Sequence, residues 1–227
     1  MGNQKVTELT ALTTLDPDDI IYVVDDPAGS PLSRKMTMEN VVKAGFGAVA
    51  SDILVAHTVL HDETLSGAGV FDVSDISQAF DDLLIVLTAR STVAATGDSS
   101  YIFFNNDTTT TNYHRQFHIV GNAAHAVGES ADPYVGSGPA ATSTAGSFGL
   151  IHIYIPKYTN TNYLKLAMSA AVFLNSAATM STGFHDVIWE DGGTTAINRI
   201  QLRPDGYPTD NYATNSNLRI YGIGQSG

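Results

Sequence analysis

The chain has 227 residues and contains no cysteine, which excludes disulfide bonds, thiolate metal ligands and cysteine nucleophiles. Basic residues are few: 11 Lys and Arg stand against 23 Asp and Glu, and the formal net charge is −12. A chain this acidic repels phosphate backbones. Its largest basic cluster is the pair Arg34-Lys35, so we expect no nucleic-acid partner.

Long apolar runs are missing as well. No stretch reaches the length of about eighteen apolar residues that a membrane-spanning helix needs. The N-terminus, MGNQKVTELTALTTLD, has no apolar segment of the kind that signal peptides contain. Position 6 is Val6, which departs from the myristoylation pattern. We therefore expect no membrane partner and a protein made in a cytoplasm, from which lysis can release it.

The usual catalytic motifs are also absent. The chain has no phosphate-binding glycine loop, no His-Glu-x-x-His and no Gly-x-Ser-x-Gly. Asp25-Asp26 and Asp81-Asp82 are adjacent carboxylates beside turns. Neighbouring residues of a strand point to opposite faces, so neither pair is expected to converge on a substrate. We expect no catalytic residues and no enzyme activity.

Metal and cofactor sites are equally hard to assemble from this sequence. Of the seven histidines, His114 and His118 share one face of a strand, but strand rise separates them by roughly 13 Å, too far for one ion. His152 alternates with apolar residues and is interpreted as a core or interface histidine. The turn NND at 105–107 offers fewer than the six oxygens that calcium takes. We expect no metal ligands, no cofactor-binding residues and no cofactor.

What the sequence does contain is a series of short β patterns. The strongest, DDLLIVLTAR at 81–90, is apolar on both faces, as a central sandwich strand is. Further strands are predicted at 53–60, 69–73, 99–105, 113–120, 147–155, 163–173, 186–189, 197–203 and 218–223. Polar turns separate them, and no long helical pattern occurs. We expect a mainly β fold, a jelly-roll-like antiparallel β-sandwich.

The first fifty residues have a different pattern. The run at 20–24 predicts a short strand, and Thr37 is placed to cap a two-turn helix at 38–44. A strand and a short helix cannot bury enough apolar area to fold alone, so this segment is expected to dock on something. We divide the chain into an N-terminal attachment segment, 1–50, and a β-sandwich domain, 51–227.

Two other features bear on binding. The stretch 121–146 is rich in small residues and is predicted to be a long loop with one short strand near 132–136. Such a loop either binds ligands or is buried in a subunit interface. Trp189, with Tyr154, Tyr158 and Tyr163, offers a carbohydrate platform, although a single Trp in a strand is more typical of a core.

Three segments resemble a known class of proteins. The first, at 101–116, reads YIFFNNDTTTTNYHRQ, and the second, at 217–224, reads NLRIYGIG. In this order they resemble the β-sandwich modules of virion surface proteins from tailed bacteriophages, in which a strand ends in a Phe-Asn-Asn-Asp turn and the last strand carries Ile-Tyr-Gly. The third, KVTELTALTTLDPDDIIYVVDDPAGSPLSRKMTMENV, is similar to attachment segments near the N-termini of phage tail-fibre and virion surface proteins.

The resemblance implies a structural protein of the virion surface, made in the host bacterial cytoplasm. The expected role is a capsid decoration, cement or short head-fibre subunit that binds phage capsid or tail proteins through its N-terminal segment and forms a homotrimer. The alternative is a tail-fibre or tail-tip protein that recognises a host surface glycan or protein. The absence of a collagen-like or coiled-coil shaft favours the first role.

Overall fold

The computed structural model describes residues 57–120, 125–176, 179–190 and 194–224, except the side chains of 120, 125 and 176, together with the backbone of 20–25 and 32–37. The chain divides into an N-terminal unit, Met1–Ala56, and a sandwich unit, His57–Gly227. In the N-terminal unit β1 (Ile20–Asp25) pairs antiparallel with β2 (Leu32–Thr37). The strand predicted at 20–24 is confirmed, whereas the predicted helix at 38–44 lies outside the described residues.

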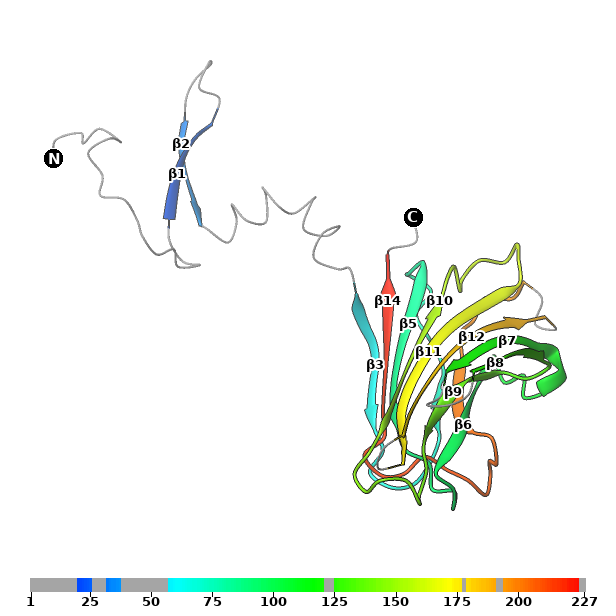
Figure 1. Ribbon diagram of the computed structural model, residues 1–227. Helices are drawn as coiled ribbons and strands as arrows, with labels where there is room; N and C mark the ends of the chain where they lie inside the picture. Colours follow the sequence, from blue (N-terminus) through cyan, green and yellow to red (C-terminus); the bar gives the residue numbers. More distant parts are fainter. Residues whose placement is uncertain are drawn as a thin grey trace. The chain divides into compact units, whose positions relative to one another are not determined.

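The sandwich unit consists of two antiparallel sheets (Figure 1). The larger has the order β3-β14-β5-β10-β11-β12-β7-β8 and the smaller the order β4-β13-β6-β9. The strands of the larger sheet are β3 (Thr58–Thr64), β5 (Asp82–Ala89), β7 (Tyr113–Val120), β8 (His125–Ser130), β10 (Gly149–Ile155), β11 (Lys165–Ser176), β12 (Thr179–Trp189) and β14 (Asn217–Ile223). Those of the smaller sheet are β4 (Phe71–Val73), β6 (Gly97–Phe104), β9 (Tyr134–Pro139) and β13 (Ile200–Pro204). The expected mainly β sandwich is confirmed.

The chain crosses repeatedly between the two sheets. Each strand of the smaller sheet follows one strand of the larger sheet and precedes another, an alternation that jelly rolls share. The last strand, β14, lies between β3, the first strand of the unit, and β5 (Figure 1). The two ends of the sandwich unit are therefore held together by a strand pair. Within the described residues no helix is long and apolar enough to span a membrane.

The hydrophobic core lies between the sheets. In β5 every second residue is buried, and Leu83, Ile85 and Leu87 have no exposed area. The smaller sheet supplies Phe71, Ile102, Phe104, Ile200 and Leu202, all fully buried. Full burial of such a side chain stabilises a fold by about 1.5–3 kcal/mol. The alternate residues of β5 are half-buried, as expected for a strand that lies between β14 and β10.

Two parts of the strand prediction are wrong. The expected loop at 121–146 contains β8 and β9, of which only β9 matches the short strand predicted near 132–136. The strand β12 begins at Thr179, well before the predicted start at 186. Both errors have one cause: Gly128 in β8 and Gly183 in β12 occupy places where the apolar pattern breaks. A Cβ at Gly128 would lie 2.8 Å from the Phe117 ring, and one at Gly183 would lie 2.7 Å from the His185 ring.

Candidate interaction surface

The turn after β6, which carries the sequence resemblance, joins two parts of the sandwich. Asn105 and Asn106 have φ of 49° and 66°, in the left-handed region that Asn tolerates. The Asn105 side-chain oxygen accepts hydrogen bonds from the backbone N–H groups of Asn198, at 2.9 Å, and Arg199, at 3.2 Å. These bonds attach the turn to the segment that leads into β13. Asn105 and Asn106 therefore have a structural role in this turn.

Asp107 is the next residue of this turn, and its side chain is hydrogen-bonded to the last residue of β12. Its carboxylate accepts hydrogen bonds from the Trp189 indole, at 2.7 Å, and from the Asn112 amide, at 3.0 Å. Burial opposes ionisation of this carboxyl, but the hydrogen bonds outweigh it and keep the pKa of Asp107 below its usual range. The Tyr113 hydroxyl donates to the Asp107 carbonyl at 2.9 Å. Protein donors thus occupy the side-chain oxygens of Asn105 and Asp107.

Trp189 belongs to the core. It is 3% exposed, and its ring lies 5.7 Å from that of Phe104 and 6.4 Å from that of Tyr113, measured between centroids. Tyr158 is also fully buried. The carbohydrate platform of Trp189 with Tyr154, Tyr158 and Tyr163 is therefore wrong, and the core interpretation of Trp189 is confirmed. The large area that an indole buries accounts for this outcome.

His114 and His118 both lie exposed on the outward side of β7. The His114 ring is 2.6 Å from the carboxylate of Glu190, which follows the neighbouring strand β12. His118 lies opposite Phe184 in the strand register. Sequence spacing missed the acidic neighbour of His114 because Glu190 is far away along the chain. Within the described residues, no three His, Asp or Glu side chains gather as a metal site requires.

His152 is exposed on the outer side of β10, so its interpretation as a core residue is wrong. The residues that β10 buries are Ile151 and Ile153 on the opposite face. The apolar neighbours on which that interpretation depended, Leu150 and Tyr154, lie on the outer side and are only half-buried. The other interpretation, an interface histidine, stays a prediction.

Among the described side chains, the buried histidine is His185 of β12, which sequence reasoning did not single out. It is 1% exposed, its ring lies edge-on to Tyr134 at 4.5 Å, and neither ring nitrogen has a hydrogen-bond partner among the described residues. Burial and the nearby Arg115 guanidinium lower the pKa of His185 to about 4. The guanidinium itself lies 2.9 Å from the carboxylate of Asp132. His185 is therefore neutral near pH 7, beside a cavity of about 40 Å³.

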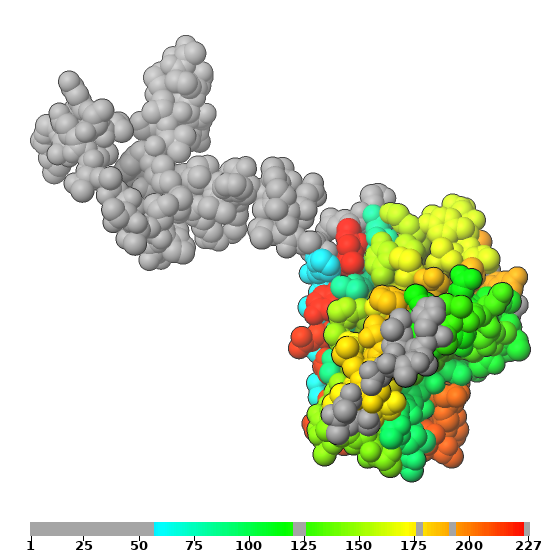
Figure 2. Space-filling model, in the orientation of Figure 1, coloured from blue at the N-terminus to red at the C-terminus, as the bar shows by residue number. Residues whose placement is uncertain are grey.

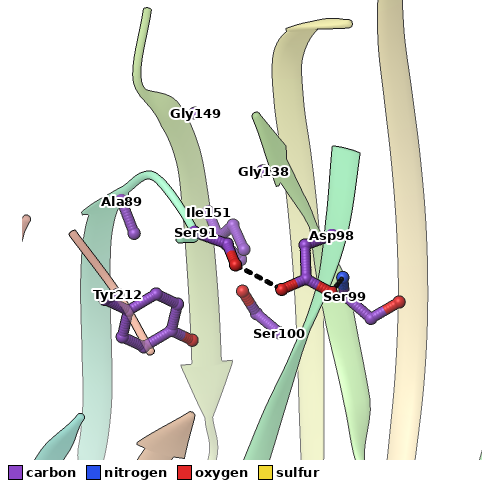
Figure 3. A pocket seen from close by; sticks show the side chains of 9 residues that line it. All are labelled: Ala89, Ser91, Asp98, Ser99, Ser100, Gly138, Gly149, Ile151 and Tyr212. Atoms are coloured by element: carbon purple, nitrogen blue, oxygen red, sulfur yellow. Dashed lines mark hydrogen bonds between the residues drawn. The ribbon is translucent and has the colours of Figure 1, made fainter. Parts of the chain in front are cut away.

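A second cavity, of about 10 Å³, lies beside β6 (Figure 3). At its wall the Asp98 carboxylate accepts hydrogen bonds from the Ser91 hydroxyl, at 2.5 Å, and the Ser99 N–H, at 2.8 Å. Burial raises the pKa of Asp98. In Figure 3 the buried Tyr212 hydroxyl points toward Ser100. A volume of this size admits one water molecule at most, so the cavity is too small for a substrate.

The carboxylates Asp81 and Asp82 meet at one turn. Asp82 accepts hydrogen bonds from the Tyr154 hydroxyl, at 2.7 Å, and from the Lys157 N–H, at 2.8 Å. Asp81 lies 2.8 Å from the Lys157 ammonium, and Lys157 itself has a φ of 45°. The pair stabilises the turn that follows β10, which agrees with its placement beside a turn in the sequence. The side chains of Asp25 and Asp26 lie outside the described residues.

A broad apolar surface lies on the outer face of the larger sheet, away from the smaller sheet. Its exposed apolar side chains come from β11 and β12, which are yellow to gold in Figure 2. They are Leu166, Met168, Val172, Met180, Phe184 and Ile188, each at least 36% exposed. We call these six residues, with Ala170 and the outward residues of β10 between Leu150 and Tyr154, the outer patch. The strand register fixes its rows: Ala170 lies between His152 and Phe184, and Met168 lies between Tyr154 and Asp186.

The outer patch is almost free of charge. Among the outward residues of β10, β11 and β12, Asp186 is the one carboxylate, and no Lys or Arg occurs. A shallow groove of about 410 Å³ adjoins the patch where β12, β7 and β8 lie side by side. Gln116, Phe117, His118, Val127, Gly128, Glu129, Phe184 and Asp186 line it.

No protein-family model, curated protein or solved structure matches this chain.

Proposed function

We propose that this protein is a structural component of a bacteriophage virion, most specifically a capsid decoration, cement or short head-fibre subunit. The observation that carries the proposal is the outer patch. An otherwise polar, acidic chain exposes a contiguous apolar sheet face, which is typical of a surface that an assembly covers. The resemblance at 101–116 and 217–224 supports a virion as that assembly.

In this proposal the two units have different roles. The N-terminal unit attaches the protein to capsid or tail proteins, and the sandwich unit faces outward. Among the described residues, the buried core of the sandwich unit consists of side chains between Phe71 and Ile220. We therefore expect the sandwich unit to fold without residues 1–50. Three copies associate into a homotrimer on the virion surface.

A particle-binding experiment tests the attachment. Purified phage particles that lack the protein are incubated with the full chain or with a variant that lacks residues 1–50, and bound protein is measured after sedimentation. We expect the full chain to sediment with the particles and the shortened variant to stay in solution, while circular dichroism shows equal β content. Gly67→Ala, a change in an open loop of the sandwich unit, is the control and should bind normally. Equal binding by the shortened variant would contradict the proposal.

A second candidate function is receptor binding at the tail, and the groove beside β7 favours it. The exposed ring of Phe184 can stack on the apolar face of a sugar, and the Asp186, Glu129 and Gln116 side chains can bond its hydroxyl groups. Location within the virion separates the two functions. Many copies over the capsid favour decoration, and a few copies at the tail favour receptor binding.

A further inference from the structure

We infer that the outer patch is the surface through which copies of this chain contact one another, each patch facing the patches of its neighbours around a shared axis. The inference deepens the proposed function, because it rests on self-association of the subunit and names the surface responsible. Four observations support it: the chemistry of the patch, its size, its charge and the poor fit of other occupants.

The chemistry of the patch is that of an interface centre. In the row through Ala170, the flanking residues are His152 and Phe184, and in the next row Met168 lies between Tyr154 and Asp186. Aromatic residues and Met are enriched at the centres of protein interfaces, and charged residues are depleted there. Phe184 is 52% exposed and Met168 is 50% exposed, so both keep much of their side chains available for a partner.

The size of the patch is sufficient for a specific contact. Together with the outward side of the adjoining strand β7, it extends along β11 from Leu166 to Leu174 and across β10, β11, β12 and β7. At a strand spacing of about 4.8 Å and a rise of about 3.3 Å per residue, this is roughly 500 Å² of sheet face. Two such faces together cover about 1,000 Å², which is close to the lower limit for a biological interface.

The charge of the chain favours this face over others. Each copy carries a formal charge of −12, so two copies repel each other over most of their surfaces. The patch brings only Asp186 into the contact. Its carboxylate needs a donor when it is desolvated, and the exposed imidazole of His152 on a neighbouring copy can supply one.

Other occupants fit the patch less well. A membrane surface would require basic residues to meet anionic lipids, and the outward residues of β10, β11 and β12 include no Lys or Arg. A sugar fits the adjoining groove, where carboxylate and amide groups gather, rather than the aliphatic rows of β11. An apolar face of these dimensions fits the same apolar face on neighbouring copies around a shared axis.

Light scattering on the full-length protein tests the inference. The wild-type mass should be a multiple of 24.1 kDa. Ala170→Arg places a guanidinium at the centre of the patch, and Phe184→Asp replaces the ring with a carboxylate. Because each buries an unpaired charge, each should weaken self-association at least about 100-fold and yield a single-chain mass. Both positions are exposed, so circular dichroism and urea unfolding should show unchanged folding.

The control is Val59→Arg, at a 56% exposed apolar residue on the edge strand β3 of the same sheet, outside the patch. It should remain assembled. A wild-type chain that is monomeric at micromolar concentration would overturn the inference, and so would assembled Ala170→Arg and Phe184→Asp variants. If these variants stay assembled while Phe184→Asp alone loses binding to host-cell polysaccharide, the face belongs to a receptor site and the inference is wrong. None of these results bears on whether the protein belongs to the virion. The proposed function is tested separately, by the presence of the protein in purified particles.

Discussion

Asp107 joins the turn after β6 to the end of β12 through its bonds to the Trp189 indole and the Asn112 amide. Replacement by Ala leaves the buried indole N–H without an acceptor. We expect Asp107→Ala to lower the free energy of unfolding by about 2 kcal/mol, as the loss of bonds to a charged acceptor does. Urea denaturation measures the change. Thr108→Ala, at the exposed next residue, is the matched control and should change little; equal losses in both variants would contradict the role of Asp107.

His185 makes the stability of the sandwich unit depend on pH. Its folded pKa of about 4 lies below the ordinary value of 6.5, so the unfolded chain binds the proton first as the pH falls. The contribution is fully present above pH 6.5 and is lost as the pH falls toward 4. By linkage it amounts to roughly 3 kcal/mol.

Urea unfolding at pH 7 and pH 4.5 measures this effect. We expect His185→Leu to be less sensitive to acid than the wild type, because the buried group that must be protonated on unfolding is gone. His152→Gln, which removes an exposed imidazole on β10, should keep the wild-type difference between the two pH values. If His185→Leu also keeps that difference, burial of His185 is not its source.

The two histidines also show where residue-level prediction fails. Around His152 the residues on both faces of β10 are apolar, so alternation alone cannot tell which face is inside. His185 lies in the run GFHD, where Gly183 and Asp186 interrupt the apolar alternation, so the sequence does not indicate which face is buried. Burial there follows from the pairing of β12 with β11 and β7, which only the tertiary structure supplies.

Among the strands, β14 carries the clearest sequence requirement. A Cβ at Gly222 would lie 2.4 Å from the Phe80 ring, which packs against this strand. Gly222→Ala should therefore lower the free energy of unfolding by about 1–3 kcal/mol, as overpacking of a core does. Gly67→Ala is the control, since a Cβ at Gly67 meets nothing within 4 Å. Thermal unfolding compares the two variants, and an equal effect of both would contradict the requirement at Gly222.

Strands with strong apolar alternation could be predicted from the sequence, whereas the edge strand β8 could not. β5, β7 and β14 appear close to their expected bounds because their pattern is long and regular. β8 reads HAVGES and lies at the edge of the larger sheet, where only one neighbour contributes to its burial. A weak pattern with a central glycine therefore predicts a loop rather than a strand.

At the scale of the whole molecule, the two-sheet sandwich followed from the number and spacing of the strands. The outer patch did not, because the apolar pattern alone does not tell which face of β11 and β12 the smaller sheet leaves uncovered. An exposed apolar face on a chain of net charge −12 is typical of a surface that an assembly covers. This face is the feature of the fold on which the proposed assembly depends.

A density map of the purified virion tests the central claim most directly. Our account predicts sandwich-shaped density on the particle surface, grouped in threes, with the outer patches turned toward one another and the N-terminal units toward the particle. Particles that lack this protein altogether, as judged from the map and from mass spectrometry of the same sample, would contradict the account.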